Sequence, residues 1–534
     1  MTEAGGDDVL GLLMLAFEGE TTIPTWLDAR LDEAPPAGFT LFRFHNVRSP
    51  EQVRALTDAL QARAPEGLPF LIAADQEGGQ FQALGEGPTP FPGAMALGAT
   101  GDVALAERVA RAIGLELAAM GVNVCYAPVA DVVATRANPA LGIRGFGSEA
   151  AAVAGMVAAT VRGLRSAGVA ATAKHFPGKG RCAVDTHHAL GFVDCDRARL
   201  DAVELAPFRA AIAERLDLVM SGHFAVPALT GADDVPSTLA REVMSDLLRS
   251  ELGFDGVTIT DALDMKALNQ GPNQVLDVLA ALRAGVDLLL LAADPVGRER
   301  VTSGLRHASR RRLLDSDGVQ RSLGRVSELR RRLGPLLEAG RPGLDVVGSN
   351  AHRALSREVA ARSLTVVRDE ARNLPLRVGP EERILAIMPR PVDLTPADTS
   401  STVQPGLAAA LRAVHPHVDE LVVGYAPDDA EIATARRCAT DAAAVVVGTI
   451  AAAPGSAQAD LVNTLLATGR PVVTAALRTP WDLLAYPDAR THLCTYSVLP
   501  DSLDALASVL VGRVEPSGRL PVALGDLYAV GHGL

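Results

Sequence analysis

The apolar residues between the start of the chain and Leu333 fall into short runs that are hydrophobic on both faces. These runs cover residues 10–17, 40–44, 70–75, 122–129, 169–175, 216–223, 257–261 and 286–292. Stretches with apolar residues at helical spacing separate most of them, among them residues 51–64, 103–120, 150–167 and 197–215. Strands that are apolar on both faces and alternate with helices are typical of a parallel sheet. Eight such units predict a (β/α)8 barrel of the TIM type.

A segment rich in Gly and Pro, residues 339–350, interrupts this pattern. Beyond it, apolar runs resume at 364–368, 384–388, 421–424, 443–448 and 471–477, with helical patterns at 428–441 and 457–467. This second region predicts a smaller three-layer α/β/α sandwich. We therefore expect a catalytic barrel domain over residues 1–338, a linker over 339–350 and a sandwich domain over 351–534.

The charge of the chain limits the partners to be expected. It has 534 residues, 50 of them basic and 63 acidic, which gives a net charge of -13. A nucleic-acid partner would require a basic face. The main basic clusters, residues 306–312 and 330–332, lie within a predicted helix over 299–333 and are interpreted as a solvated helix face. We therefore expect no nucleic-acid partner.

The five cysteines are scattered, and none forms a C-x-x-C pair. They indicate neither a zinc site nor a disulfide framework, and they suit a reducing compartment. The apolar run at 9–17 follows no basic segment and is predicted to be a strand rather than a signal peptide. No uncharged run approaches the ~20 residues of a membrane span. We expect a cytoplasmic protein without membrane association, metal or cofactor, and leave its oligomeric state open.

Polar residues end several of the predicted barrel strands. Asp75, His175, His223 and Asp261 each close an apolar run. The carboxyl ends of the strands are where barrel enzymes build their active sites. These four side chains are therefore candidates for a common site.

The loop after His175 holds a carboxylate and an imidazole two residues apart, at Asp185 and His187. Alternate side chains of an extended segment lie on the same side. A carboxylate beside an imidazole raises its pKa and selects its tautomer, which favours a general acid/base near neutral pH. Taken alone, a D-x-H triplet is a weak signal.

Asp261 has two interpretations on the residues alone. At the end of a barrel strand it could be the nucleophile of a glycosyl transfer. It could equally be the N-cap of a following helix. Asp264, three residues later, is interpreted as a helix surface residue.

Six segments of the predicted barrel resemble motifs of glycoside hydrolase family 3, and they occur in the family's order. They are DQEGG at 75–79, NPALGIRGF at 138–146, KHFPGKG at 174–180, DTH at 185–187, MSGH at 220–223 and TDALDM at 260–265. Residues 470–482 and 516–522 are similar to the family's C-terminal domain. The resemblance covers nearly the whole chain.

This resemblance implies a retaining glycosidase of the β-N-acetylglucosaminidase branch, because that branch carries a D-[ST]-H triplet on a barrel loop. It implies that Asp261 attacks the anomeric carbon, that His187 is the acid/base and that Asp185 supports His187. It also implies a set of sugar contacts. These are Asp75, Arg144, Lys174 and His175, with His223 as a further sugar contact or a residue behind the site.

Five positions depart from the family pattern. Lys179 stands where the branch usually has His, and Arg181-Cys182 where it has Asp-Thr. Gln80 and Ala83 replace two arginines, and the second of these contacts the sugar in relatives. The exact sugar and aglycone are therefore left open.

Three functions remain possible on the sequence. The first is a β-N-acetylglucosaminidase acting on cell-wall or chitin-derived fragments. The second is a β-glucosidase or a phosphorylase of the same family, since His187, unlike Glu, does not repel a phosphate dianion. The third is a weakly active or non-catalytic sugar-binding homologue, against which the intact Asp261, Asp185 and His187 argue. The substrate expected in each case is a small carbohydrate.

Overall fold

The computed structural model describes residues 7–534 except 20, 137, 139, 339 and 397. Residues 1–6 of the predicted barrel domain, Pro139 of the NPALGIRGF segment and residue 339 of the predicted linker lie outside the described residues. None of the described helices is long and apolar enough to cross a bilayer.

Within the described residues, eight parallel strands form one sheet that closes on itself. They are β1 (Leu13–Leu15), β2 (Gly38–Thr40), β3 (Leu71–Ala74), β6 (Val124–Cys125), β7 (Ala170–Phe176), β9 (Leu218–Ser221), β11 (Val257–Thr260) and β12 (Leu289–Leu291). Their order is β11-β9-β7-β6-β3-β2-β1-β12, and a parallel bridge between Ile259 and Leu288 joins the two ends. Each strand overlaps one apolar run, so the predicted (β/α)8 barrel is confirmed.

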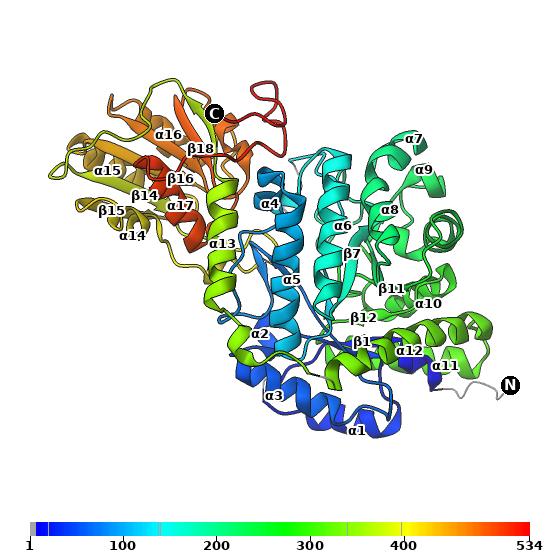
Figure 1. Cartoon of the computed structure of the whole chain (residues 1–534). Coiled ribbons are helices and arrows are strands. Elements are labelled where there is room, and N and C mark those ends of the chain that lie inside the picture. The colour runs from blue at the N-terminus through cyan, green and yellow to red at the C-terminus, as the bar shows by residue number, and fades with distance from the viewer. Residues whose placement is uncertain (1–6, 20, 137, 139, 339, 397) are drawn as a thin grey trace.

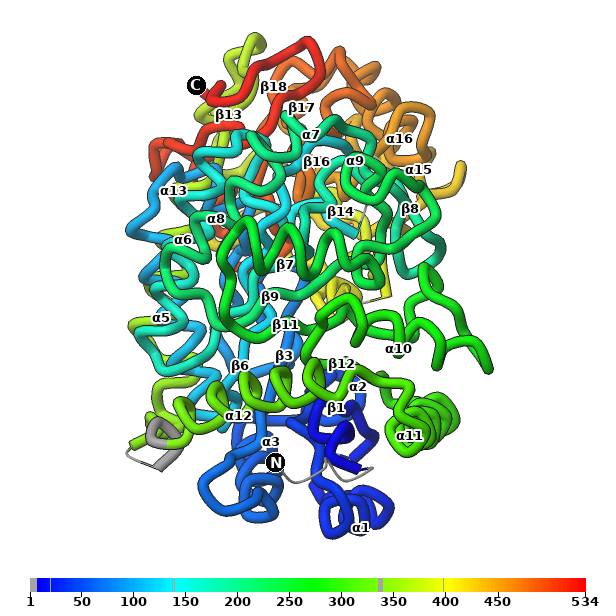
Figure 2. Tube along the Cα trace, turned by 90° about the vertical axis from the view of Figure 1, so that its right-hand side faces the viewer, coloured from blue at the N-terminus to red at the C-terminus, as the bar shows by residue number. Residues whose placement is uncertain are grey.

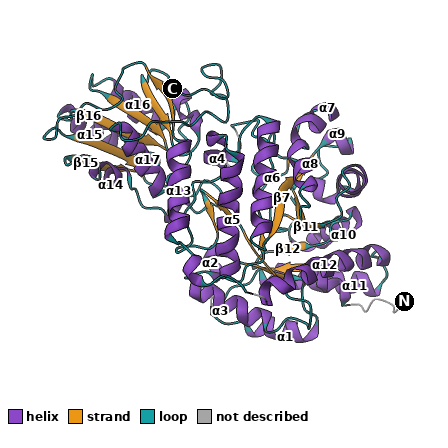
Figure 3. Cartoon of the chain, in the orientation of Figure 1, coloured by secondary structure: helices purple, strands orange, loops and turns teal. Residues whose placement is uncertain are grey.

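Helices surround these strands, as Figures 2 and 3 show. They are α1 (Thr25–Glu33), α2 (Arg43–Asn46), α3 (Pro50–Gln61), α4 (Ala94–Thr100), α5 (Val103–Ala119), α6 (Ala150–Ser166), α7 (Arg197–Arg199), α8 (Ala206–Ala213), α9 (Pro227–Thr230), α10 (Gln274–Ala284), α11 (Pro295–Arg310) and α12 (Ser316–Glu338). Residues Leu200–Glu204 and Glu242–Glu251 are π-helical. Two short additional pairs, β4 (Gln76–Gly78) with β5 (Phe81–Gln82) and β8 (Gly191–Phe192) with β10 (Phe224–Ala225), lie outside the barrel sheet.

Two predicted elements differ from the observed ones. The second strand ends at Thr40, and part of the run assigned to it forms the short helix α2. The helix expected over 299–333 is two helices, because the chain turns between Arg310 and Ser316. A side-chain oxygen of Asp315 accepts from the backbone N–H of Asp317 (3.1 Å), which starts the second helix anew.

The predicted solvated basic face of this stretch is wrong for Arg330. This residue is 6% exposed, lies over the ring of Phe70 and donates to the carbonyl oxygens of Leu68 and Pro69. Burial lowers its pKa to about 10. The stem and guanidinium of Arg330 therefore fix α12 against the start of β3.

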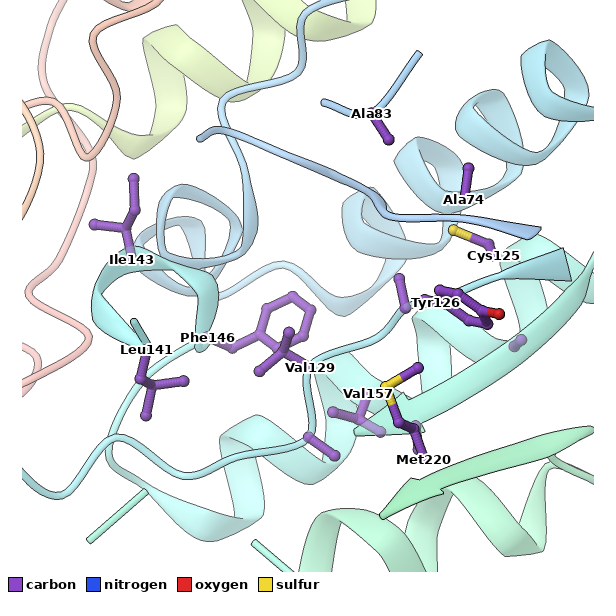
Figure 4. Close-up of a cluster of buried hydrophobic side chains, with 14 of the residues drawn as sticks. Ala74, Ala83, Cys125, Tyr126, Val129, Leu141, Ile143, Phe146, Val157 and Met220 are labelled. Carbon is purple, nitrogen blue, oxygen red and sulfur yellow. The ribbon is translucent and has the colours of Figure 1, made fainter. Parts of the chain in front are cut away.

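Apolar side chains of the barrel strands and of the loops that follow them form one continuous hydrophobic core. Figure 4 shows side chains from β3, β6 and the turn at 142–144 in one cluster, with Ala74, Cys125 and Ile143 among them. Strands β3, β7, β9 and β11 are buried at every position. This burial on both faces explains why their sequences read as continuous apolar runs.

The second region is a mixed six-stranded sheet between two layers of helices. Its strands are β13 (Thr365–Asp369), β14 (Ile384–Pro389), β15 (Val418–Val423), β16 (Ala444–Thr449), β17 (Val472–Ala476) and β18 (Thr491–Cys494). Its helices are α13 (Asn350–Ser363), α14 (Leu407–Arg412), α15 (Asp429–Thr440), α16 (Ala457–Leu466) and α17 (Pro500–Leu510). The strand order is β13-β18-β17-β16-β14-β15, and β13 is antiparallel to β18.

Alternate residues of the central strand β14 belong to two separate cores. Ile384 and Met388 pack with α14 and α17, whereas Leu385 and Ile387 belong to the core on the opposite face. This alternation confirms the predicted three-layer sandwich. The strand β18 and the helices α13, α14 and α17 were not predicted from the apolar pattern.

The sandwich lies beside the barrel, and α13 runs between them (Figure 1). α13 packs against α4 and α5 of the barrel and against α17 of the sandwich. α12 ends at Glu338 and α13 begins at Asn350, but the domain limits at 338 and 351 remain predictions.

Candidate active site

The strand ends at the carboxyl end of the barrel surround a cavity of about 330 Å³. The first residue after β3 is Asp75, and the first after β11 is Asp261, so both carboxylates come from the same end of the sheet. His187 reaches the cavity from the loop after β7. The lining includes Phe42, Arg43, Phe44, His45, Asp75, Phe81, Ala83, His187, Ala262, Asp264, Met265, Lys266, Pro396 and Thr399.

Two hydrogen bonds to backbone groups hold Asp261 at the end of β11. Its N–H donates to the carbonyl oxygen of Ser221 (3.1 Å), and its Oδ1 accepts from the N–H of Ala262 (2.9 Å). Turns follow, and the next helix, α10, begins only at Gln274, so Asp261 is not a helix N-cap. Asp264 lies in the same turns and not on a helix surface.

The charge state of Asp261 follows from its neighbours. Burial opposes its ionisation, but the nearby His223, Lys179 and His187 outweigh burial and hold the pKa of Asp261 below its ordinary value. An ionised carboxylate at a strand end is the form required of a nucleophile.

Asp185 and His187 form a close pair, as their spacing predicts. The Nδ1 of His187 lies 2.7 Å from Oδ1 of Asp185, and the same oxygen accepts from the backbone N–H of His187 (3.0 Å). Burial opposes ionisation of Asp185, but these hydrogen bonds prevail and lower its pKa to about 2. Because an ionised carboxylate only accepts, Nδ1 carries the proton and Nε2 of His187 is left for a ligand.

A buried ion network connects the ends of β3 and β7. The Nζ of Lys174 lies 2.5 Å from Asp75 and 2.6 Å from Glu77. Glu77 also accepts two hydrogen bonds from Arg144, at 2.9 and 2.8 Å. The guanidinium of Arg144 lies 4.1 Å from the ring centroid of Phe81.

Glu77 is the centre of this network, although sequence reasoning did not single it out. Burial opposes its ionisation, but the charges of Arg144 and Lys174 lower its pKa to about 2. Glu77 lies inside the DQEGG segment, and that position was the only available signal. The predicted sugar contacts Asp75, Arg144 and Lys174 are thus brought together by a residue that the prediction omitted.

His175 faces Asp261 from β7. Its Nε2 lies 3.9 Å from Oδ2 of Asp261, and its Nδ1 lies 2.8 Å from Oδ2 of Asp131. Burial lowers the pKa of His175 well below its ordinary value, so the ring is neutral. Asp131 is a second residue that sequence reasoning missed, and burial raises its pKa to about 6.

His223 lies behind the strand end of Asp261. Its Nδ1 is 2.8 Å from the hydroxyl of Thr238, and its Nε2 is 3.2 Å from the carbonyl oxygen of Ala262. Both ring nitrogens therefore have protein partners. This geometry favours the position behind the site over direct contact with a sugar.

The two basic residues that depart from the family pattern, Lys179 and Arg181, differ in their burial. Lys179 is 2% exposed, and its charge acts on both Asp131 and Asp261. Arg181 is exposed and donates from Nε to the carbonyl oxygen of Asp194 (2.9 Å). Of these two residues, only Lys179 contributes a charge that lowers the pKa of Asp261.

The second domain forms part of the cavity wall, a contact that the sequence left open. Pro396 and Thr399 line the cavity opposite the barrel residues. The N–H and the hydroxyl of Thr399 both donate to the backbone carbonyl oxygen of Gln80 (2.9 Å each). Ala83, where relatives have an arginine, also lines the cavity and leaves room beside this wall.

The site holds no recognisable metal centre among the residues that the structure describes, since no group of three or more His, Cys, Asp or Glu side chains is arranged to bind an ion. Of the cavity carboxylates, Asp75 already pairs with Lys174. The chemistry open to this arrangement is that of a carboxylate, an imidazole and a set of polar groups that suit sugar hydroxyls.

A (β/α)8 barrel whose strand ends carry carboxylates around a cavity that an imidazole also lines has the architecture of a barrel enzyme. Residues 31–329 match the model of the glycosyl hydrolase family 3 N-terminal domain. The chain belongs to glycoside hydrolase family 3, as its motifs predict.

Three relatives illustrate the likeness. Beta-hexosaminidase A of Pseudoalteromonas piscicida is 35% identical over 381 residues, which cover 67% of this chain but only 63% of the relative, less than two thirds of its length. The beta-N-acetylglucosaminidase/beta-glucosidase of Cellulomonas fimi is 29% identical over 98% of this chain and 94% of its own. The solved family 3 beta-N-acetylglucosaminidase of Paenibacillus sp. str. FPU-7 is 34% identical, with a TM-score of 0.90 over 97% of this chain and 98% of that one.

Replacing Glu77 by Gln should destabilise the protein strongly, because it leaves Arg144 and Lys174 as buried cations with too few carboxylates. We expect the free energy of unfolding at neutral pH to fall by about 3–5 kcal/mol in urea titrations. Glu358→Gln, which removes a more exposed partner of Arg108, is the matched control and should cost at most about 1 kcal/mol.

The loss of stability in Glu77→Gln should depend on pH. The pKa of Glu77 is depressed in the folded protein, so the stability from its ionised form is present above about 4.5 and is lost as the pH falls toward about 2. The difference in the free energy of unfolding between the parent protein and Glu77→Gln should therefore become smaller as the pH falls over that interval. A gap of constant size would contradict the proposed ionisation of Glu77.

Proposed function

We propose that this protein is a retaining glycosidase that removes terminal β-linked N-acetylglucosamine from cell-wall or chitin-derived fragments. The observation that carries the proposal is the Asp185–His187 pair, in which Nδ1 of His187 faces Asp185 while His187 lines the cavity beside Ala262, the residue that follows Asp261. The names of the similar proteins from Pseudoalteromonas, Cellulomonas and Paenibacillus support the choice of sugar.

The proposed first step joins Asp261 to the sugar. The carboxylate attacks the anomeric carbon as the bond to the glycosidic oxygen breaks. A protonated His187 donates the Nε2 proton to that oxygen, so the leaving group departs as a neutral alcohol. Asp185 accepts a hydrogen bond from Nδ1–H of His187, whose proton stays on the ring, and stabilises the cationic ring before the transfer.

The second step returns the enzyme to its starting state. Neutral His187 takes a proton from water at Nε2, the water oxygen attacks the anomeric carbon, and Asp261 leaves as a carboxylate. The sugar is released with its original β configuration, because two displacements invert the anomeric carbon twice.

The remaining polar residues divide into two groups in this proposal. Asp75, Lys174 and His175 hold the sugar hydroxyls, since their polar atoms lie around the strand ends that frame Asp261. Arg144 and His223 act from behind, through Glu77 and through the Ala262 carbonyl respectively. The five residues of the predicted binding set thus keep a role at the site, but with unequal access to the ligand.

The second domain bears on the choice between branches of the family. In the glucosidase branch the acid/base is a Glu from that domain. Among the described residues that line this cavity, the second domain supplies Pro396 and Thr399 and no carboxylate. This arrangement supports His187 as the acid/base.

The five cysteines are all free, and we retain a reducing, cytoplasmic location as part of the proposal.

Phosphorolysis is a second candidate, which the buried charge of Lys179 favours. A cation beside Asp261 would attract a phosphate dianion as the acceptor in place of water. The product would then be a sugar 1-phosphate rather than the free sugar.

A panel of nitrophenyl β-glycosides, assayed with and without inorganic phosphate, tests both candidates. We expect the N-acetylglucosaminide to be turned over at least about tenfold faster than the glucoside, with free sugar as the product in either buffer. Faster turnover in phosphate with a sugar 1-phosphate product would favour phosphorolysis. Absence of turnover on every glycoside would favour the non-catalytic alternative.

Asp261→Asn should nearly abolish turnover while the fold is retained, because an amide cannot serve as the covalent nucleophile. We expect a loss of at least about 100-fold in kcat. Asp264→Asn, in the neighbouring turn of the same cavity, is the matched control and should lose much less. A loss below about 100-fold would remove Asp261 from the nucleophile role.

His187→Ala should harm natural substrates more than activated aryl glycosides, because a poor leaving group needs protonation and a good one needs it less. The glycosyl-enzyme on Asp261 should then accumulate, since the second step lacks its base. Added azide needs no base and should restore turnover with a glycosyl azide as the product.

The exposed neighbour His188 provides the control, because its side chain is 64% exposed and its replacement by Ala removes an imidazole at the same loop. Asp185→Ala should show a milder form of the His187→Ala behaviour, because Asp185 only orients and tunes the ring. Equal slowing of natural and activated substrates, without azide rescue, would exclude His187 as the acid/base and with it the proposed branch.

A further inference from the structure

The active site has a polar side and an apolar side. The proposed sugar contacts Asp75, Lys174 and His175 lie at the ends of β3 and β7, where they pair with one another or face Asp261. Much of the cavity lining is apolar instead. Its apolar residues are Phe42, Phe44, Phe81, Ala83, Ala262, Met265, Ala292, Ala293 and Pro396. Because the transferred sugar needs the polar side, the apolar side is left for the group to which that sugar is linked.

Phe44 differs from the other aromatic residues of this lining. It is 67% exposed, whereas Phe81 is 2% exposed and the ring of Phe42 packs against His45 with the ring centroids 6.3 Å apart. A phenyl ring that stays in water contributes little to the hydrophobic stabilisation of the fold. An exposed apolar group on the wall of a cavity is, however, typical of a ligand site.

Hydrogen bonds fix the backbone that carries Phe44. This residue belongs to α2, whose last residue, Asn46, is fully buried. Oδ1 of Asn46 accepts from the backbone N–H of Phe42 (3.1 Å), and its Nδ2 donates to the carbonyl oxygens of Phe17 (2.8 Å) and Gly19 (3.0 Å). A ring on a fixed backbone loses little conformational entropy when a ligand binds to it.

We propose that Phe44 is the platform of a leaving-group subsite, on which the sugar beyond the scissile bond stacks. A β-linked pyranose whose substituents are equatorial carries ring C–H bonds on its two faces and hydroxyls around its rim. The faces are therefore apolar and match an exposed aromatic ring. This inference rests on the proposed function and adds that the released N-acetylglucosamine was linked to a second pyranose.

The residues that share this cavity with Phe44 fit that position of the second sugar. In the proposed mechanism His187 protonates the oxygen that joins the two sugars, so the departing sugar lies next to His187. Both Phe44 and His187 line the cavity, and its volume of about 330 Å³ is within the range of small-molecule sites. Pro396 adds a further apolar residue to this lining from the second domain.

The test compares two substrates that carry the same sugar and differ in the leaving group. β-N-acetylglucosaminyl fluoride releases a fluoride ion, which has no face to stack, whereas N,N′-diacetylchitobiose releases a second sugar. Phe44→Ala should reduce the ratio of kcat/KM for the disaccharide to kcat/KM for the fluoride by about tenfold. Phe44→Trp keeps an aromatic face and should retain most of this ratio.

Phe192→Ala is the matched control. Phe192 is also exposed, at 51%, but it lies on β8 and is not among the described residues that line the cavity. Its replacement should leave the ratio of the two kcat/KM values as it is in the parent protein. If Phe44→Ala does not fold, as judged by circular dichroism, Phe44→Leu takes its place, because it keeps an apolar side chain and removes the ring.

A second measurement uses the subsite in the opposite direction. The fluoride is the donor, and methyl α-N-acetylglucosaminide is the acceptor that competes with water. In the second step an acceptor hydroxyl gives its proton to His187, its oxygen bonds to the anomeric carbon, and Asp261 leaves as a carboxylate. Phe44→Ala should lower the ratio of the transfer product to the free sugar by about tenfold, whereas Phe192→Ala should not.

The outcomes separate this inference from the proposed function. If both substrates are cleaved and a folded Phe44→Ala changes neither ratio, the subsite is overturned and the proposed function stands. The same holds if the parent protein cleaves the fluoride but neither cleaves the disaccharide nor forms a transfer product. If it cleaves neither substrate, the proposed function fails and the subsite with it. Lower ratios in Phe44→Ala, but not in Phe192→Ala, support both.

Discussion

The buried contact between Lys174 and Glu77 is the constraint on which the rest of the site depends. Burying a single charge is costly, and these charges are buried at 2% and 5% side-chain exposure. The cost is offset only because Arg144 and Asp75 complete an alternating network of two cations and two carboxylates. The network joins the end of β3, the end of β7 and the turn before α6, so it fixes the strand ends that frame Asp261.

Burial and charge together give neighbouring carboxylates different tasks. Asp185 and Glu77 each receive hydrogen bonds from cationic or imidazole donors, and their pKa values fall to about 2. Burial raises the pKa of Asp131 to about 6, because its hydrogen-bond donors are backbone N–H groups and the neutral ring of His175 rather than cations. The pKa of Asp261 is lowered by the charges of His223, Lys179 and His187, although burial opposes this, and among the described residues its nearest ion-pair partner is His175 at 3.9 Å. A carboxylate that is charged and only loosely held is the one free to attack.

Much of the fold and part of the site could be predicted from the sequence. The eight barrel strands are recoverable because each is buried on both faces, and Asp185 and His187 because a spacing of two in a loop is local. Glu77 and Asp131 could not be found in that way, since their importance comes from Arg144 and His175, which lie far along the chain. Helix α13 was missed because its partners belong to two different domains.

The second domain explains why the cavity cannot be understood from the barrel alone. Thr399, which lines the cavity together with Pro396, donates to the backbone carbonyl oxygen of Gln80, a contact that any side chain at position 80 would permit. The side-chain amide of Gln80 is itself buried without a hydrogen-bond partner in the described part of the chain, so it adds a cost there and not affinity. The wall therefore depends on Thr399 and on the small side chain of Ala83, both of which line the cavity. Of the two departures, only the small side chain at position 83 leaves space beside the wall that the second domain supplies, whereas the side chain at position 80 has no part in that contact.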